Sequence, residues 1–196
     1  MQSGGANISA VVLAGGQGRR IGGGKAHVLL AQKPMWRHVA ERIAPQVNAL
    51  AINAPEPFDD YPIVTDSLPG LGPLSGVLAA MHWAQSQGAA RVLTVAVDTP
   101  FLPSDLGKRL SAAMAPIVMA RTADGVHGTT ALWDVSLAHD LEAFLRGGGR
   151  KVTAWAMGHQ VAHVDFADAR PPMFFNVNTP EDLAQAEAWI AEALAH

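Results

Sequence analysis

Residues 8–13, ISAVVL, run directly into the glycine-rich residues 15–25, GGQGRRIGGGK, and this junction decides the fold. The first stretch is apolar and rich in β-branched residues, as expected of a parallel strand that is buried on both faces. The second contains six glycines and three cations, which is incompatible with a regular helix or strand. We therefore expect a central strand whose carboxyl end carries an irregular cationic loop.

The rest of the chain alternates short apolar runs with amphipathic stretches. This alternation with short connections predicts an α/β protein: a three-layer α/β/α, Rossmann-like fold with a mostly parallel sheet, forming a single domain over residues 1–196. Ligands of such sheets bind beyond the carboxyl ends of the strands. Further strands are expected at 49–52, 63–65, 91–97, 117–120, 129–133 and 160–166, and helices at 34–47, 73–85, 103–114, 136–145, 152–157 and 180–194.

Composition excludes several classes of function. The 196 residues carry a formal charge of -3, so there is no basic excess to attract nucleic acid or an anionic membrane, and neither is expected as a partner. Cysteine is absent, which excludes disulfides, thiolate metal sites and cysteine nucleophiles. Neither a signal peptide nor an apolar run long enough to cross a bilayer is recognised, so we expect a cytoplasmic protein.

The glycine-rich loop is typical of a phosphate-binding segment. Glycines allow backbone N–H groups to approach a phosphate closely, and arginine and lysine supply the opposite charge. The loop lacks the Gly-Lys-Ser/Thr of a P-loop, and its glycines do not fit the dinucleotide-binding pattern. The alternative reading is a flexible surface loop without a ligand.

Asp98 follows the apolar run 91–97 and is a candidate metal ligand. A carboxylate at the carboxyl end of a central strand is well placed to hold Mg²⁺, which prefers oxygen ligands and shares them with substrate phosphates. The alternative is that Asp98 caps the helix that follows.

Two other turns are candidates for contact with a ligand. Residues 66–76 end in Gly-Pro-Leu-Ser-Gly, which brings backbone close to a ligand at the start of a helix. Residues 175–182, FNVNTPED, contain the signature of a capped helix, with Thr179 as N-cap and Asp182 in the capping-box position. Asn176 and Asn178 are not needed for the cap and are available to face a ligand.

At these residues the chain resembles the molybdenum cofactor guanylyltransferase family, a group of nucleotidyltransferases. The ordered set of motifs, spread over almost the whole chain, carries the resemblance. They are the glycine-rich loop that ends at Lys25, PMW at 34–36, INA at 52–54, the segment 66–76, VDTPFLP at 97–103, HGTTALW at 127–133 and FFNVNTPEDL at 174–183.

The resemblance implies that the protein transfers GMP from Mg-GTP to the terminal phosphate of molybdopterin and releases pyrophosphate. It implies GTP and molybdopterin as substrates, Mg²⁺ as cofactor, and transient contact with molybdoenzymes or their chaperones. The implied catalytic residues are Arg20, Lys25 and Asp98, and Asp98 is the metal ligand. The implied GTP-binding residues are Leu13, Ala14, Gly15, Gly16, Lys25, Asn53, Asp66 and Asp98.

Molybdopterin is expected to contact Asn176, Asn178, Arg150 and Lys151. The last two follow three glycines, and the alternative reading for them is a solvated helix start. Where the family loop has Asp-Lys, this chain has Gly24 before Lys25. Two alternatives therefore stand beside the main interpretation: a related transferase that uses CTP or a sugar phosphate, and a catalytically weakened nucleotide-binding partner of a molybdoenzyme.

Overall fold

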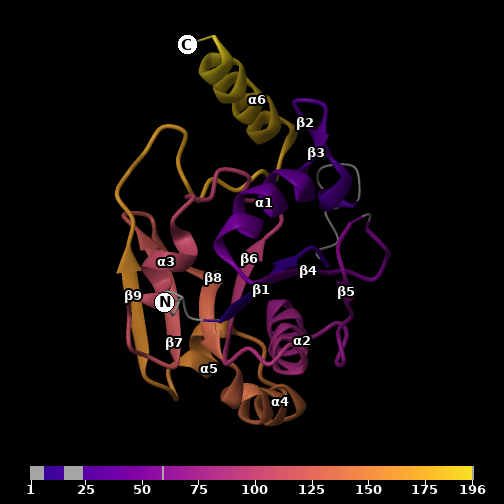
Figure 1. Cartoon of the computed structure of the whole chain (residues 1–196), viewed down its shortest axis with the longest axis vertical. Helices are drawn as coiled ribbons and strands as arrows, with labels where there is room; N and C mark the ends of the chain where they lie inside the picture. The colour runs from indigo at the N-terminus through magenta and orange to yellow at the C-terminus, as the bar shows by residue number, and fades with distance from the viewer. Residues whose placement is uncertain (1–6, 16–23, 59, 196) are drawn as a thin grey trace, which may run out of the picture.

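The computed structural model describes residues 7–15, 24–58 and 60–195. Its centre is a seven-stranded sheet in the order β5-β4-β1-β6-β8-β7-β9 (Figure 1). Only β8 runs antiparallel to its two neighbours, β6 and β7, so the predicted mostly parallel sheet is confirmed. The strands are β1 (Ile8–Leu13), β4 (Ala49–Asn53), β5 (Ile63–Val64), β6 (Arg91–Ala96), β7 (Ile117–Thr122), β8 (Gly125–Asp134) and β9 (Val161–Asp165).

Helices cover both faces of this sheet, and the last of them projects from one end of the molecule (Figure 1). The last of them begins with a full capping box, in which Thr179 and Asp182 bond each other's backbone N–H groups, as predicted from the sequence. The helices are α1 (Met35–Ile43), α2 (Pro73–Ser86), α3 (Leu106–Ser111), α4 (Ala138–Arg146), α5 (Val152–Ala156) and α6 (Pro180–Leu194). Short 3-10 turns occupy η2 (Lys25–His27), η3 (Ala44–Gln46) and η4 (Val135–Leu137), and β2 (Leu29–Leu30) pairs with β3 (Lys33–Pro34) in a hairpin.

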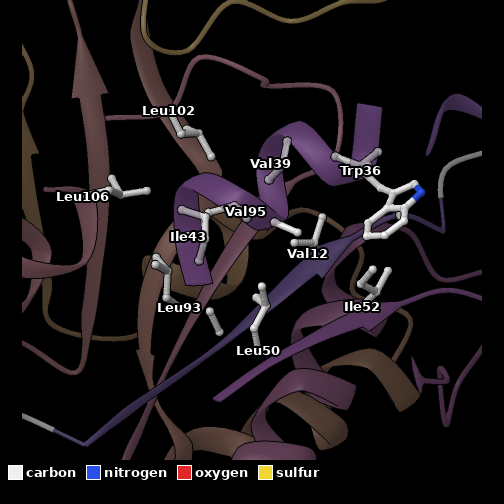
Figure 2. Close-up of a cluster of buried hydrophobic side chains, with 14 of the residues drawn as sticks. Val12, Trp36, Val39, Ile43, Leu50, Ile52, Leu93, Val95, Leu102 and Leu106 are labelled. Atoms are coloured by element: carbon white, nitrogen blue, oxygen red, sulfur yellow. The ribbon is translucent and has the colours of Figure 1, made fainter. Parts of the chain in front are cut away.

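The core has an apolar layer on each face of the sheet, and a smaller third cluster packs α6 against residues such as Phe101 and Val177. Side chains of a strand alternate between the faces, so in β1 Val12 belongs to the layer that contains α1 and α3, while Val11 belongs to the layer that contains α2 and α4. Figure 2 shows the first layer, in which Trp36, Val39 and Ile43 of α1 lie over the strands. The predicted three-layer α/β/α arrangement is therefore confirmed.

Several predicted elements have different bounds in the structure. The helix expected at 34–47 is α1, which ends at Ile43, and the 3-10 turn η3 follows it. The helix expected at 103–114 is only α3, because residues 103–105 form a turn in which Leu106 N–H bonds Pro103 O. The strand expected at 129–133 starts earlier, at Gly125, because it continues the hairpin with β7. In that hairpin the register shifts, with Met119 opposite Ala131 but the next residue of β7 opposite His127.

This register shift accompanies the end of the β6–β8 pairing. Residues 128–130 form a bulge, and the pairing of β6 with β8 ends at Thr94 opposite Ala131. The last residues of β6, Val95 and Ala96, are paired with β1. Of the helices in the described ranges, none is long and apolar enough to span a membrane.

Candidate functional site

A cavity of about 630 Å³ lies where the parallel strands end. Residues that follow β1, β4, β5 and β6 line it, and the bulge in β8 adds Thr129 from the other side. Parallel strands expose their carboxyl ends at one edge, so positions far apart in sequence meet there. The lining residues are Leu13, Gly15, Lys25, Asn53, Asp66, Gly70, Gly72, Pro73, Gly76, Ala96, Val97, Asp98, Thr129 and Asn176.

Asn53 forms one wall of the cavity, and three neighbours fix its position. Its side-chain Nδ2 donates to Val64 O at 2.9 Å and to Asp66 Oδ1 at 2.8 Å. Its Oδ1 faces Gly76, where an added Cβ would lie only 2.6 Å away. Within the described part of the chain no donor reaches Asn53 Oδ1, so this oxygen and the carboxylate of Asp66 offer acceptors to a ligand.

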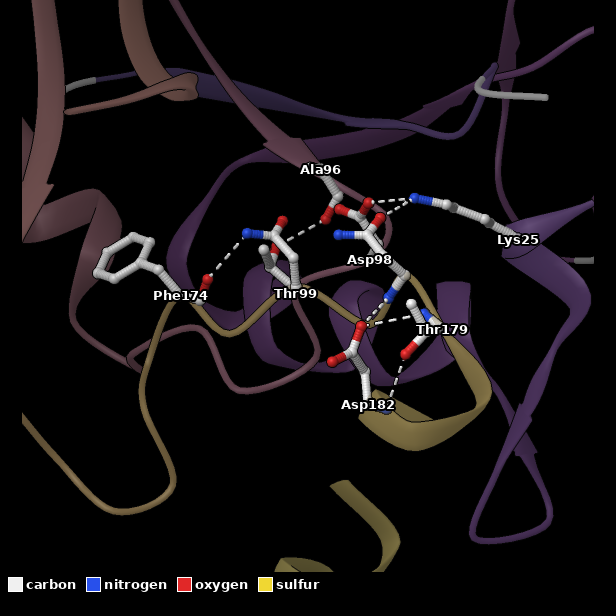
Figure 3. Close-up of polar contacts among 9 residues, drawn as sticks. Lys25, Ala96, Asp98, Thr99, Phe174, Thr179 and Asp182 are labelled. Carbon is white, nitrogen blue, oxygen red and sulfur yellow. Dashed lines mark hydrogen bonds and ion pairs between the residues drawn. The ribbon is translucent and has the colours of Figure 1, made fainter. Parts of the chain in front are cut away.

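Lys25 and Asp98 form a second polar group in the lining of the cavity, and their side chains point toward each other in Figure 3. Lys25 Nζ lies 2.9 Å from Asp98 Oδ2 and also donates to Asn178 Oδ1. The Lys25 and Asp98 side chains are only 21% and 17% exposed, so water screens the pair less than a surface ion pair. A cation and an acidic group are thus held together in the lining of the cavity.

Asp98 does not cap a helix, which rules out the alternative reading of this residue. The next helix, α3, begins at Leu106 and has Asp105 at its N-cap. The Asp98 backbone carbonyl instead accepts a hydrogen bond from Val177 N at 2.9 Å, which ties the 174–179 segment to the end of β6. The carboxylate of Asp98 lines the cavity and is paired there with Lys25.

The N-terminus of α2 meets the cavity at Gly72 and Pro73. Gly72 has a φ of 82°, a conformation that L side chains rarely adopt, and this explains the glycine before the helix. Ser75 Oγ bonds Leu68 O at 2.7 Å and closes the loop that connects β5 to the helix. The motif at 72–76 thus shapes the cavity wall rather than providing side-chain ligands.

A second cavity, of about 370 Å³, adjoins the first and shares Asn176 with it. The His127 ring is stacked on Phe174, with ring centroids 4.4 Å apart and planes 14° apart. Its Nε2 lies 2.9 Å from Thr122 Oγ1. Burial lowers the pKa of His127, and the nearby charge of Asp124 only partly opposes this, so the ring is neutral at pH 7.

The structure brings most of the residues singled out from the sequence to these cavities. Ala14 is buried and is not among the residues that line either cavity, but its N–H donates to the backbone oxygen of Asn53, which does line the first. Asn178 reaches the site through Lys25, as described above. Gly16 and Arg20 lie outside the described residues. The sequence-based candidates that line the first cavity are Leu13, Gly15, Lys25, Asn53, Asp66, Asp98 and Asn176.

Arg150 and Lys151 are not among the residues that line either cavity. Arg150 turns back on its own loop, and its Nη1 donates to Leu145 O and Gly149 O. Lys151 is exposed and stands at the N-cap of α5, the position that the alternative reading assigned to it. Their contact with molybdopterin stays a prediction.

Sequence reasoning missed residues in both cavities, among them the carboxylates of Asp124 and Asp168 in the second. Thr129 lines the first cavity because of the β8 bulge, which no local pattern reveals. His127 and Phe174 form the stacked pair of the second cavity, although they are 47 positions apart in the chain. The only available signal was that both lie in motifs shared with the family.

The fold and the position of the first cavity place this chain in the class of α/β proteins whose ligand site lies at the carboxyl edge of a mostly parallel sheet. Within that class the chain belongs to the MobA-like NTP transferase domain family, which matches residues 10–164.

Similar proteins agree with this assignment. The chain is 44% identical over 198 residues to the molybdenum cofactor guanylyltransferase of Rhizobium meliloti (strain 1021), covering 92% of this chain and 91% of the relative. It is also 44% identical over 188 residues to the protein of that name from Cereibacter sphaeroides, covering 92% and 96%.

Among solved structures, molybdopterin-guanine dinucleotide biosynthesis protein A from Archaeoglobus fulgidus superposes with a TM-score of 0.78. The sequences are 24% identical, and the superposition covers 94% of this chain and 99% of the other. This likeness shows a shared fold.

Proposed function

We propose that this protein transfers GMP from Mg-GTP to the terminal phosphate of molybdopterin, with release of pyrophosphate. The observation that carries the proposal is the Lys25–Asp98 pair beside a cavity of about 630 Å³ at the carboxyl edge of the sheet. The names of the relatives from Rhizobium meliloti and Cereibacter sphaeroides support the same reaction. The whole chain, residues 1–196, would act as a single nucleotidyltransferase domain.

The nucleoside of GTP would bind between Asn53, Asp66 and the N-terminus of α2. A guanine ring offers N–H donors that match the free acceptor of Asn53 and the carboxylate of Asp66. Gly15 and Gly76 present no side chain to the cavity, so a flat ring can approach the backbone. The cavity is also within the range typical of small-ligand sites, roughly 300–1,000 Å³.

A divalent metal fits this site when the substrate supplies most of its ligands. The described residues contain no cluster of three or more acidic, histidine or cysteine side chains that would form a complete metal cage. Mg²⁺ needs none, because it is commonly held by one or two carboxylates together with substrate phosphates and water. Asp98 would hold it, and the bound ion would neutralise charge on the triphosphate.

Lys25 would neutralise phosphate charge during the transfer. A phosphate oxygen of molybdopterin forms a new bond to the α-phosphorus of GTP, and the bond from that phosphorus to the leaving pyrophosphate breaks. The attacking group is already an anion, so no strong general base is required, and charge neutralisation and in-line placement dominate. Lys25, held by Asp98 and Asn178, has its ammonium group oriented before substrate arrives.

The second cavity is the place where molybdopterin would bind. It adjoins the nucleotide cavity at Asn176, so a ligand in it could present a phosphate to the nucleotide. The carboxylates of Asp124 and Asp168 line it and suit the N–H donors along the edge of a pterin ring. Contacts with molybdoenzymes or their chaperones, and a cytoplasmic location, stay predictions from the sequence.

The decisive experiment measures pyrophosphate release with molybdenum-loaded molybdopterin and each of GTP, CTP and ATP, with Mg²⁺ present. Of the three nucleotides, we expect only GTP to give pyrophosphate release, and we expect no release from GTP when molybdopterin is omitted. Release with CTP would favour the related transferase, and GTP binding without release would favour the weakened nucleotide-binding partner. His127→Ala, which removes the ring stacked on Phe174, should raise KM for molybdopterin while leaving KM for GTP unchanged.

A further inference from the structure

We propose that Asp182 is a positioning residue for the reaction, because it holds Asn178 in the place from which Asn178 orients Lys25. This inference rests on the proposed function of the Lys25–Asp98 site. Asp182 lines neither cavity. It acts on Lys25 through Asn178, whose backbone N–H it binds and whose side chain contacts the lysine (Figure 3).

A chain of hydrogen bonds connects Asp182 with the site. Asp182 Oδ2 accepts from Asn178 N and from Thr179 N, both at 2.9 Å. The side-chain Oδ1 of Asn178 then accepts from Lys25 Nζ, which is paired with Asp98. The carboxylate is therefore linked to the ion pair through a single intervening residue.

One of the two hydrogen bonds to Asp182 Oδ2 is not needed for the helix cap. In a capping box the third residue of the helix bonds the N-cap backbone, which here is the bond to Thr179 N. The additional bond to Asn178 N reaches a residue that lies before the N-cap. This second bond fixes the backbone of Asn178, and helix formation alone does not explain it.

The residue preceding Asn178 is fixed as well. Val177 is buried and its N–H donates to Asp98 O at 2.9 Å, on the strand side of the site. Asn178 is thus held from one side by the end of β6 and from the other by the first turn of α6. Because the backbone is fixed on both sides of Asn178, its side-chain amide oxygen is held in position to accept from the Lys25 ammonium group.

The test compares Asp182→Ala with Thr179→Ala. Thr179→Ala removes the hydrogen bond from Asp182 N at 3.2 Å and weakens the cap, but keeps the carboxylate on Asn178 N. Both variants should lower the midpoint of thermal unfolding. Only Asp182→Ala should also lower kcat for pyrophosphate release with GTP and molybdopterin, by about tenfold, as is usual when a partner that orients a functional group is lost.

A double variant tests whether Asp182 acts through Asn178. If it does, Asp182→Ala combined with Asn178→Ala should have the kcat of Asn178→Ala alone, whereas independent effects would multiply. If Asp182→Ala does not fold, Asp182→Asn keeps an acceptor oxygen, and its kcat should lie between those of wild type and Asn178→Ala.

The failure of this inference is distinct from that of the proposed function. Wild-type protein without pyrophosphate release would contradict the function, and titration with GTP in a calorimeter would then compare the variants. Where wild type releases pyrophosphate, equal kcat in Asp182→Ala and Thr179→Ala would overturn the positioning role. Where it does not, equal GTP affinity in the two variants would overturn it.

Discussion

Lys25 Nζ lies 2.9 Å from Asp98 Oδ2, although the two residues are 73 positions apart in the chain. The lysine precedes the first helix, and the aspartate follows β6, so only the folded sheet brings them together. The ammonium group neutralises a carboxylate that would otherwise be poorly solvated. Under the proposed function, a triphosphate with its metal ion would take over both charges.

Asp98→Asn should nearly abolish turnover while leaving the fold intact. The change removes the charge that would hold Mg²⁺ and keeps a side chain of the same shape, so we expect pyrophosphate release to fall by about a hundredfold or more. The control is Asp105→Asn, which alters an exposed carboxylate at the N-cap of α3. Turnover close to wild type in Asp98→Asn at ordinary Mg²⁺ concentration would contradict a metal-binding role.

Gly76→Ala should weaken GTP binding because the new Cβ would lie 2.6 Å from Asn53 Oδ1 and 3.0 Å from Leu13 Cδ2. Such overpacking costs about 1–3 kcal/mol of folding free energy and would displace Asn53 from the cavity wall. Gly107→Ala is the matched control, since this glycine is also helical and its nearest contact would be an ordinary 3.4 Å. Calorimetric titration measures the GTP affinity of both variants, and thermal unfolding measures their stability. A GTP affinity of Gly76→Ala equal to that of Gly107→Ala would contradict the prediction.

GTP should bind at least about a hundredfold more tightly than ATP, because a site built to hydrogen-bond particular groups rejects a ligand that lacks them. Asp66 supplies an acceptor in the cavity and also holds Asn53 Nδ2 at 2.8 Å. Asp66→Asn should therefore narrow the difference between the two nucleotides. Equal dissociation constants for GTP and ATP in the wild-type protein would refute this assignment of the nucleoside site.

Acidification below about pH 6.5 should destabilise the protein through His127 and His38. Burial lowers the pKa of both histidines in the folded chain, whereas unfolding restores the ordinary value of about 6.5. The unfolded state then binds more protons as the pH falls through that window, so the free energy of unfolding decreases. The contribution of the two neutral histidines to the free energy of unfolding is fully present above pH 6.5. It is lost as the pH falls toward the lower pKa that each histidine has in the folded protein.

Urea unfolding at pH 7.5 and pH 5.5 measures this effect. His127→Asn should reduce the loss of stability between the two pH values, since one of the two buried titrating groups is gone. His139→Asn, at an exposed position on α4, is the control and should show the full loss. An unchanged pH dependence in His127→Asn would argue against its contribution.

The sequence alone was sufficient for the elements whose cause is local. The apolar runs predicted the parallel strands, and the Thr179–Asp182 signature predicted the start of α6 and its cap. The end of the run 91–97 also indicated Asp98 as a candidate, because a strand end in such a sheet faces the ligand. Failures occurred where the cause is not local: α3 is shorter than its helical pattern, since a turn at Pro103 delays its start.

Tertiary structure decided which of these residues meet. The bulge in β8 brings Thr129 to the first cavity, and the stacking of His127 on Phe174 builds the second. Asn178 reaches Lys25 only because the segment before α6 is tied to the end of β6. Such contacts depend on strand order, register and side-chain direction. Local periodicity reports which face of an element is buried, but it does not report which distant residue lies opposite.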